Sequence, residues 1–261
     1  MPYICYEKLS DRQDTLGQSW QGENIPENIK LCDVQPIGRT IIKYLKKTDK
    51  ILEAGCGLGR WIFYFRDRGY DIIGIEASKR AVQAANNYDP TADIRVGDVK
   101  KVDLPDASFD AVISLGVMEH FIEGPQDALK ETRRLLKNNG YLFVAIPPSN
   151  ILRMTITHPL TSLAKLVNTL RGYGHAFSEY RYTVTDFQRH LKTARFEVID
   201  IVTDELLLPR NFGLYTDFPI FRQREEKWAL NTAGILIVRF LNTLSDKICR
   251  GGVLFICRKL S

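Results

Sequence analysis

A glycine-rich turn after an apolar segment constrains this chain most. Residues 51–61 read ILEAGCGLGRW, so Gly55, Gly57 and Gly59 stand on alternate positions. Glycine has no Cβ, which lets the backbone turn sharply with positive φ and approach a ligand closely. The pattern is therefore typical of a loop that binds a nucleotide-type cofactor. The dinucleotide pattern G-x-G-x-x-G would require a glycine where this chain has Arg60, and it normally lies nearer the start of a domain.

Acidic residues follow the next two apolar segments. Glu76 comes directly after DIIGI, and Asp98 follows ADIRVG. An acidic side chain about twenty residues beyond the first glycine can accept hydrogen bonds from both hydroxyls of an unphosphorylated ribose. Because parallel strands end at one edge of a sheet, Glu53, Glu76 and Asp98 are expected to line one crevice. Three carboxylates suit a ligand with an amine, a ribose and a cationic centre.

Apolar strand-like segments alternate with helical ones along the chain. This alternation predicts an α/β fold with a doubly wound, mostly parallel sheet. Strands are expected at residues 50–54, 71–75, 92–96, 109–115, 141–146, 196–202 and 251–260. Helices are expected at residues 34–47, after the glycine turn, and at 78–87, 125–140 and 183–196, with Ser78 as one N-cap and Gly140 as one C-terminal stop.

Five segments in order resemble the class I S-adenosylmethionine-dependent methyltransferases of the type 11 methyltransferase domain family. They are EAGCGLGR from residue 53, GIEAS from 74, GDV from 97, LPDASFDAVISLGVMEHF from 104 and LKNNGYLFVAIP from 136. Together they cover roughly residues 35 to 150. The resemblance implies a Rossmann-like sheet of seven strands with an antiparallel last strand, and S-adenosylmethionine as the cofactor.

The resemblance also implies a set of cofactor-binding residues. The glycine loop would wrap the methionine part, Glu76 would hold the ribose, and Asp98 with the backbone of Val99 would read the adenine. Cys56, between two glycines, is interpreted as a small space-filling residue and not a nucleophile. The full predicted set is Glu53, Gly55, Cys56, Gly57, Gly59, Glu76, Ala77, Asp98, Val99 and Leu115.

His120 is the candidate catalytic residue, because it follows the fourth strand beside the expected methyl donor. A histidine there could accept a proton from an acceptor hydroxyl near neutral pH. The alternative is that it only ties this loop to the next helix. A related subfamily binds a metal through E-x-x-E-H, but Gly116 stands at the first glutamate position here. No metal site is therefore predicted.

Two long segments fall outside the expected core. Residues 1–34 are expected to form an N-terminal arm, and residues 35–261 a single domain with insertions at 148–182 and 205–250. Connections this long in such folds are usually functional, so arm and insertions are predicted to cap the acceptor pocket. The segment HAFSEYRY places His175, Tyr180 and Tyr182 there, either as a clamp for the acceptor or as core of the cap.

Composition excludes several classes of protein. The net charge of the 261 residues is +5 without a run of five like charges, which does not favour nucleic-acid binding. The five cysteines include no C-x-x-C pair, so neither a disulfide framework nor a zinc site is indicated and a reducing cytoplasm is expected. The N-terminus lacks the pattern of a signal peptide. The apolar segment 233–241 is short and contains Arg239, which argues against a membrane span but leaves peripheral association open.

These features predict an enzyme that transfers a methyl group in line from S-adenosylmethionine to a small-molecule acceptor. Two alternatives stay open: a nicotinamide-dependent oxidoreductase, and a catalytically silent methyltransferase-like protein that binds partners. The sequence does not fix the acceptor, the atom methylated or the oligomeric state.

Overall fold

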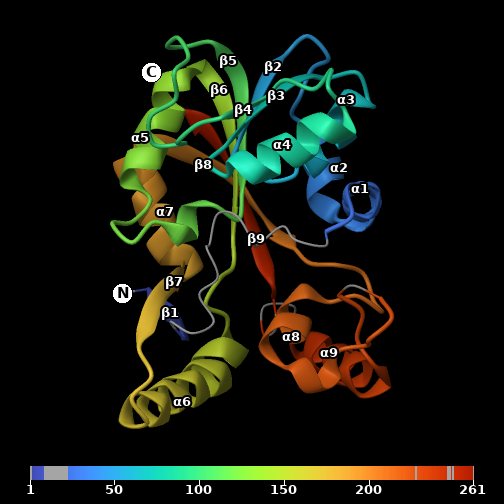
Figure 1. Cartoon of the computed structure of the whole chain (residues 1–261), viewed down its shortest axis with the longest axis vertical. Helices are drawn as coiled ribbons and strands as arrows, with labels where there is room; N and C mark the ends of the chain where they lie inside the picture. The colour runs from blue at the N-terminus through green and yellow to red at the C-terminus, as the bar shows by residue number, and fades with distance from the viewer. Residues whose placement is uncertain (1, 9–22, 227, 246–247, 249, 261) are drawn as a thin grey trace.

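A seven-stranded sheet forms the centre of the molecule in this computed structural model, which describes residues 2–8, 23–226, 228–245, 248 and 250–260 (Figure 1). The strand order is β4-β3-β2-β5-β6-β9-β8. β9 runs antiparallel to both of its neighbours, β6 and β8, and the other pairings in this sheet are parallel. The strands are β2 (Lys50–Ala54), β3 (Asp71–Glu76), β4 (Ile94–Val96), β5 (Phe109–Leu115), β6 (Leu136–Ile146), β8 (Phe196–Asp204) and β9 (Gly252–Lys259). The predicted fold class, with its antiparallel last strand, is confirmed.

Helices cover both faces of the sheet, as Figure 1 shows. Alternate residues of each strand point to opposite faces, so Ile51 joins one hydrophobic cluster and Leu52 the other. The first cluster includes residues of α1 (Ile25–Val34), α2 (Pro36–Ile42), α3 (Arg60–Arg66) and α4 (Lys79–Tyr88). The second includes residues of α5 (Gln126–Leu135) and α7 (Val184–Thr193). These two buried layers fix the strand ends in space.

Two predicted helix boundaries were wrong. The helix expected at 34–47 covers only Pro36–Ile42, because Pro36 holds the preceding Gln35 in an extended conformation (φ −85°, ψ 127°) and Val34 ends the separate helix α1. The helix expected at 125–140 ends at Leu135, and Gly140 lies inside β6. Leu136 is fully buried and pairs with Phe109 of β5, so sheet pairing takes this residue away from the helix. The predicted cap Ser78 is confirmed, since its Oγ accepts a hydrogen bond from the backbone N–H of Ala81.

Two insertions follow the carboxyl ends of parallel strands. The first insertion, residues 148–182, follows β6 and contains a π-helical turn (Arg153–Thr157), α6 (His158–Leu170) and β7 (His175–Arg181). The second insertion, residues 205–250, follows β8 and contains α8 (Phe212–Asp217), a short 3₁₀ turn (Pro219–Phe221) and α9 (Thr232–Leu244). β1 (Tyr3–Lys8) pairs antiparallel with β7, which forms a separate two-stranded sheet. Both insertions lie at one end of the molecule in Figure 1.

A buried ionic network joins the two insertions. The Arg153 side chain is fully buried; its Nε lies 2.6 Å from Asp217 Oδ2 and it also donates to the Pro148 carbonyl oxygen. The other oxygen of Asp217 accepts from Arg181 at 2.9 Å. Arg181 in turn contacts Glu179 at 2.8 Å. Asp217 of the second insertion therefore neutralises guanidinium groups from two places in the first insertion.

Removal of Asp217 should be far more destabilising than loss of an ordinary surface ion pair. We expect Asp217→Ala to lower the free energy of unfolding by about 3 to 5 kcal/mol, because the buried Arg153 would lose its charged partner. The control is Asp33→Ala, which removes an exposed ion pair with Arg68 and should cost about 1 kcal/mol or less. Urea unfolding of both variants tests this, and equal losses would contradict the network's structural role.

Candidate functional site

The glycine loop leaves β2 and enters α3 with three residues in left-handed conformations. The φ angles are +82° at Gly55, +55° at Gly57 and +77° at Gly59. A Cβ at Gly55 would clash with Val117 Cγ2, and one at Gly59 would lie 2.7 Å from Ile94 Cδ1. Glycine is therefore required at these two positions both by backbone conformation and by close packing.

Glu76 holds the loop to the next strand. Its Oε2 accepts a hydrogen bond from the Gly57 N–H at 2.9 Å, and its Oε1 accepts one from the Ser78 N–H at 2.8 Å. The side chain is buried. Each carboxylate oxygen has two lone pairs, so one N–H on each leaves room for two hydroxyl donors. Glu76 can thus position the loop and bind a ligand with the same carboxylate.

Glu53 is a buried carboxyl group in the middle of the sheet, where it pairs with Gly74 of β3 and Ile113 of β5. Burial raises its pKa to about 8; Arg60 opposes this increase and Glu76 adds to it. Its Oε2 has no hydrogen-bond partner among the described residues. A buried acceptor of this kind beside the glycine loop suits a cationic group of a ligand.

The remaining predicted cofactor residues follow adjacent strands. Ala77 is exposed between Glu76 and Ser78, and half-buried Leu115 ends β5. Asp98 is exposed shortly after β4 and accepts the Lys100 N–H at 2.9 Å, whereas Val99 is buried. Since β4, β3, β2 and β5 are neighbours, the structure brings the predicted set to one edge of the sheet.

Cys56 has a packing role in this loop. Its Sγ would lie 2.7 Å from a Cβ added at Gly74, so the thiol fills the space above that glycine. Burial raises the pKa of the thiol well above its usual value. A neutral buried thiol is a poor nucleophile, in agreement with the interpretation from sequence.

His120 lies on a short 3₁₀ turn (Met118–His120) after β5, with its ring exposed. Its Nδ1 is 3.0 Å from the carbonyl oxygen of Ser178 on β7. Donation from Nδ1 to this carbonyl leaves the lone pair on Nε2, which is the form that can accept a proton. The ring is therefore tied to β7, not to the next helix, and the tie is compatible with a base.

The three predicted acceptor-site residues occupy different environments. Tyr180 donates its hydroxyl to the carbonyl oxygen of Ile122 at 2.9 Å, so it lies over the turn that carries His120. Tyr182 is fully buried and packs on Phe187 in a core cluster. Tyr182 thus corresponds to the core alternative, not to a clamp. His175 is half-buried at the other end of β7, opposite Lys8.

Two carboxylates lie beside His120: Glu119, which belongs to the E-x-x-E-H comparison, and Glu179, which did not emerge from sequence. Glu119 is buried, its Oε2 has no partner in the described part of the chain, and burial raises its pKa to about 7, which the nearby His120 opposes. One ligand atom each of Glu119, His120 and Glu179 lie within 4.8 Å of one another. Glu179 comes from β7, so the E-x-x-E-H comparison could not find it. Glu179 is also paired with Arg181. That no metal binds at this cluster stays a prediction.

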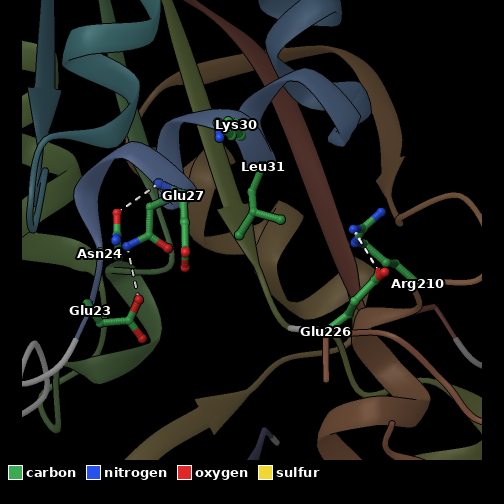
Figure 2. A pocket seen from close by; sticks show the side chains of 8 residues that line it. Glu23, Asn24, Glu27, Lys30, Leu31, Arg210 and Glu226 are labelled. Carbon is green, nitrogen blue, oxygen red and sulfur yellow. Dashed lines mark hydrogen bonds and ion pairs between the residues drawn. The ribbon is translucent and has the colours of Figure 1, made fainter. Parts of the chain in front are cut away.

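A pocket of about 340 Å³ opens between α1 and the second insertion. Figure 2 shows its acidic and basic side chains, with Arg210 and Glu226 in an ion pair at 3.0 Å. Its lining residues are Glu23, Asn24, Glu27, Asn28, Lys30, Leu31, Arg210 and Glu226. None of the residues predicted to bind cofactor or acceptor lines it, so this pocket is distinct from the predicted site.

The raised pKa of Glu53 predicts a pH dependence of folding. Because the folded-state pKa of about 8 exceeds the ordinary 4.5, the stability contribution of the neutral group is full below pH ~4.5 and is lost as pH rises through 8. Relative to Glu53→Gln, the wild type should lose up to about 1.4 kcal/mol per pH unit in that range. Urea unfolding of ligand-free protein at several pH values measures this difference. Asp71→Asn, an exposed change on neighbouring β3, is the control; parallel profiles for wild type and Glu53→Gln would contradict the assignment.

Comparison with known proteins agrees with this geometry. Residues 52–144 match the family described as "Methyltransferase domain". A probable S-adenosylmethionine-dependent methyltransferase of Mycolicibacterium smegmatis is 34% identical over 97 residues, which are 37% of each chain. The human eEF1A lysine and N-terminal methyltransferase is 25% identical over 167 residues, or 59% of this chain and 22% of that protein. The chain thus aligns with less than half the length of these curated relatives.

A solved structure extends the similarity to nearly the whole fold. A SAM-dependent methyltransferase from Methanosarcina mazei superposes with a TM-score of 0.60 at 19% identity, covering 86% of this chain and 97% of that one. At this identity the similarity supports the fold alone. Residues 52–144 therefore match a methyltransferase domain, and the chain shares the fold of a SAM-dependent methyltransferase.

Proposed function

We propose that the protein transfers the methyl group of S-adenosylmethionine to a small-molecule acceptor. The observation that carries this proposal is the Glu76 carboxylate, which is fixed by the N–H groups of Gly57 and Ser78 and retains lone pairs for ribose hydroxyls. Arg60 in place of the third glycine of the dinucleotide pattern disfavours a nicotinamide enzyme. The glycine loop and Glu76 together disfavour a protein that has lost cofactor binding.

Each residue of the site has a proposed role in binding. The bound cofactor supplies an electrophilic methyl carbon. The Gly55–Gly59 loop approaches the methionine part, and the unpartnered oxygen of Glu53 lies near the cationic groups. Asp98 and the backbone of Val99 take the adenine, and Leu115 and Ala77 border the pocket. Cys56 supports the loop by packing on Gly74.

The acceptor is proposed to lie at the turn after β5. There His120 is held by the Ser178 carbonyl, and Tyr180 is held by the Ile122 carbonyl, so β7 crosses this turn. Holding the acceptor in line with the breaking bond and excluding water would supply much of the rate. Nε2 of His120 can take a proton from a hydroxyl acceptor. His175 is a more distant candidate, and Tyr182 supports Tyr180 from the core.

The two insertions and β1 are proposed to cap this acceptor site, because they lie beyond the carboxyl ends of the strands. A small molecule is the proposed acceptor, although one relative is named for methylating a protein. Incubation with metabolite pools and, separately, with proteins would show which fraction gains the mass of a methyl group. Location in a reducing cytoplasm rests on the cysteine pattern and stays a prediction.

Cofactor binding provides the direct test of the proposed function. Calorimetry should detect S-adenosylmethionine and not NAD. Glu76→Ala should weaken S-adenosylmethionine binding by about 2 to 4 kcal/mol, since charged hydrogen bonds contribute ~1.5 to 3 kcal/mol each and are not fully additive. Glu76→Ala should also lower the free energy of unfolding, because the buried N–H groups of Gly57 and Ser78 lose their acceptor. Glu76→Gln, which keeps one acceptor oxygen, should be intermediate; unchanged affinity in Glu76→Ala would remove Glu76 from the site.

Turnover of the His120 variant distinguishes a base from a structural tie. If the acceptor is a hydroxyl, His120→Ala should reduce kcat roughly 10²- to 10⁴-fold with cofactor affinity nearly intact, and the acidic limb of the pH–rate profile should disappear. His120→Asn is the matched control, because its amide can still donate to the Ser178 carbonyl without acting as a base. Full activity in both variants would leave positioning as the only contribution of this turn.

A further inference from the structure

Helix α6 presents its polar side to the protein and its apolar side to solvent. Tyr3 of β1 stacks on His158 with ring centroids 3.7 Å apart, and its hydroxyl lies 2.7 Å from Thr161 Oγ1. Lys165 Nζ lies 3.0 Å above the Tyr6 ring. These contacts all come from one side of α6. A helix on the surface of a globular protein normally has the opposite arrangement, with its apolar stripe toward the core.

The outward side of α6 consists of large aliphatic residues at helical spacing. Leu163, Leu166 and Leu170 are 58%, 56% and 80% exposed, and Leu160 and Val167 belong to the same side. Ile151 and Met154, just before the helix, are also exposed. An unpartnered stripe of this length is unusual on a soluble monomer and indicates an interaction surface.

Helix α9 of the second insertion repeats this feature. It buries Gly234 and Val238 against its own insertion, but Leu236, Phe240 and Leu244 form an exposed stripe at i, i+4 and i+8. Of the 21 large apolar side chains that are exposed among the described residues, nine lie in the first insertion and five in the second. Both helices lie at the same end of the molecule, away from the end of β9 (Figure 1).

The charge of these segments indicates what covers them. Apart from the buried Arg153, which is paired with Asp217, residues 149–178 contain the cations Lys165 and Arg171 and no aspartate or glutamate. Residues 228–245 contain Arg239 and no acidic residue. Arg171 and Arg239 are exposed close to the apolar stripes. Apolar stripes accompanied by cations alone match a surface that is apolar beneath and anionic on top, which is an anionic lipid bilayer.

We propose that α6 and α9 dock the protein on the surface of an anionic lipid membrane, with their leucine and phenylalanine stripes in the interfacial layer. Each helix has 13 residues, about 20 Å, which is shorter than the ~30 Å hydrocarbon core. In the part of the chain that the structure describes, no helix is long and apolar enough to cross a membrane. Both helices would therefore lie in the plane of the surface. Docking is independent of the proposed methyl transfer.

Co-sedimentation of the full chain with vesicles tests the docking surface. We expect binding to phosphatidylcholine vesicles that contain about one third phosphatidylglycerol, and weaker binding to phosphatidylcholine alone. The α6 variant Leu163→Ser, Leu166→Ser, Leu170→Ser should bind at least about tenfold more weakly, as should the α9 variant Leu236→Ser, Phe240→Ser, Leu244→Ser. The matched control carries Val34→Ser, Ile199→Ser and Leu260→Ser, which are exposed apolar positions outside both insertions, and should bind like the wild type.

Charge and assembly are tested on the same preparations. Arg171→Gln with Arg239→Gln should weaken binding to the anionic vesicles roughly fivefold per cation removed, with little effect on neutral vesicles. S-adenosylmethionine affinity and melting temperature should match the wild type in every variant, which separates docking from the proposed function. Absence of wild-type binding to anionic vesicles would overturn the proposal. So would equal losses in the control, or a dimer in solution that the α6 and α9 variants dissociate without any vesicle binding.

Discussion

The two hydrogen bonds of the Glu76 carboxylate are the interaction on which the cofactor end of the fold depends. They join the N–H of Gly57, in the loop after β2, to the N–H of Ser78 at the start of α4. Three successive features of the chain, a loop, a strand end and a helix cap, are thereby fixed by one side chain. Because backbone N–H groups of Gly57 and Ser78 donate to both of its oxygens, the buried Glu76 side chain is satisfied within the fold and can still accept from a pair of hydroxyls.

Glu53 and Glu119 are also buried acids, but unlike Glu76 they are not fully hydrogen-bonded. Each has an oxygen without a partner among the described residues, and burial raises the pKa to about 8 and about 7, respectively. Glu53 lies near the carboxyl end of β2 and Glu119 on the turn after β5, where the proposed cofactor and acceptor would meet them. A group that is costly to leave unpaired in the fold is a group whose pairing strengthens ligand binding. The unfavourable free energy of burying these two carboxyl groups is therefore located at the site of the proposed chemistry.

The part of the site that could be predicted from sequence is the part made by local chain. Glu53 and Glu76 lie at the carboxyl ends of β2 and β3, and the glycines and Asp98 follow β2 and β4 by a few residues, so strand order alone brings them together. Glu179 and Ser178 reach His120 from some sixty residues away through the pairing of β7 with β1, which no local pattern encodes. Tyr182 looked equivalent to Tyr180, yet it lies just beyond the end of β7, and long-range packing places it in the core cluster that includes Phe187 and Phe255. A non-local contact also explains why α5 ends earlier than predicted: Leu136 pairs with Phe109 of β5 and so belongs to the sheet.

The insertions explain why the cofactor is easier to identify than the acceptor. The cofactor end depends on backbone geometry, which allows only glycine where a Cβ would meet Val117 or Ile94. The proposed acceptor end depends on side chains of β7 and of the turn after β5, and the two insertions are joined through the buried network of Asp217, Arg153 and Arg181. Such a network fixes the position of the insertions but leaves their outward surfaces free to vary. Their apolar stripes therefore reflect what the insertions meet outside the protein, and the inverted polarity of α6 has no explanation in the folding of this chain alone.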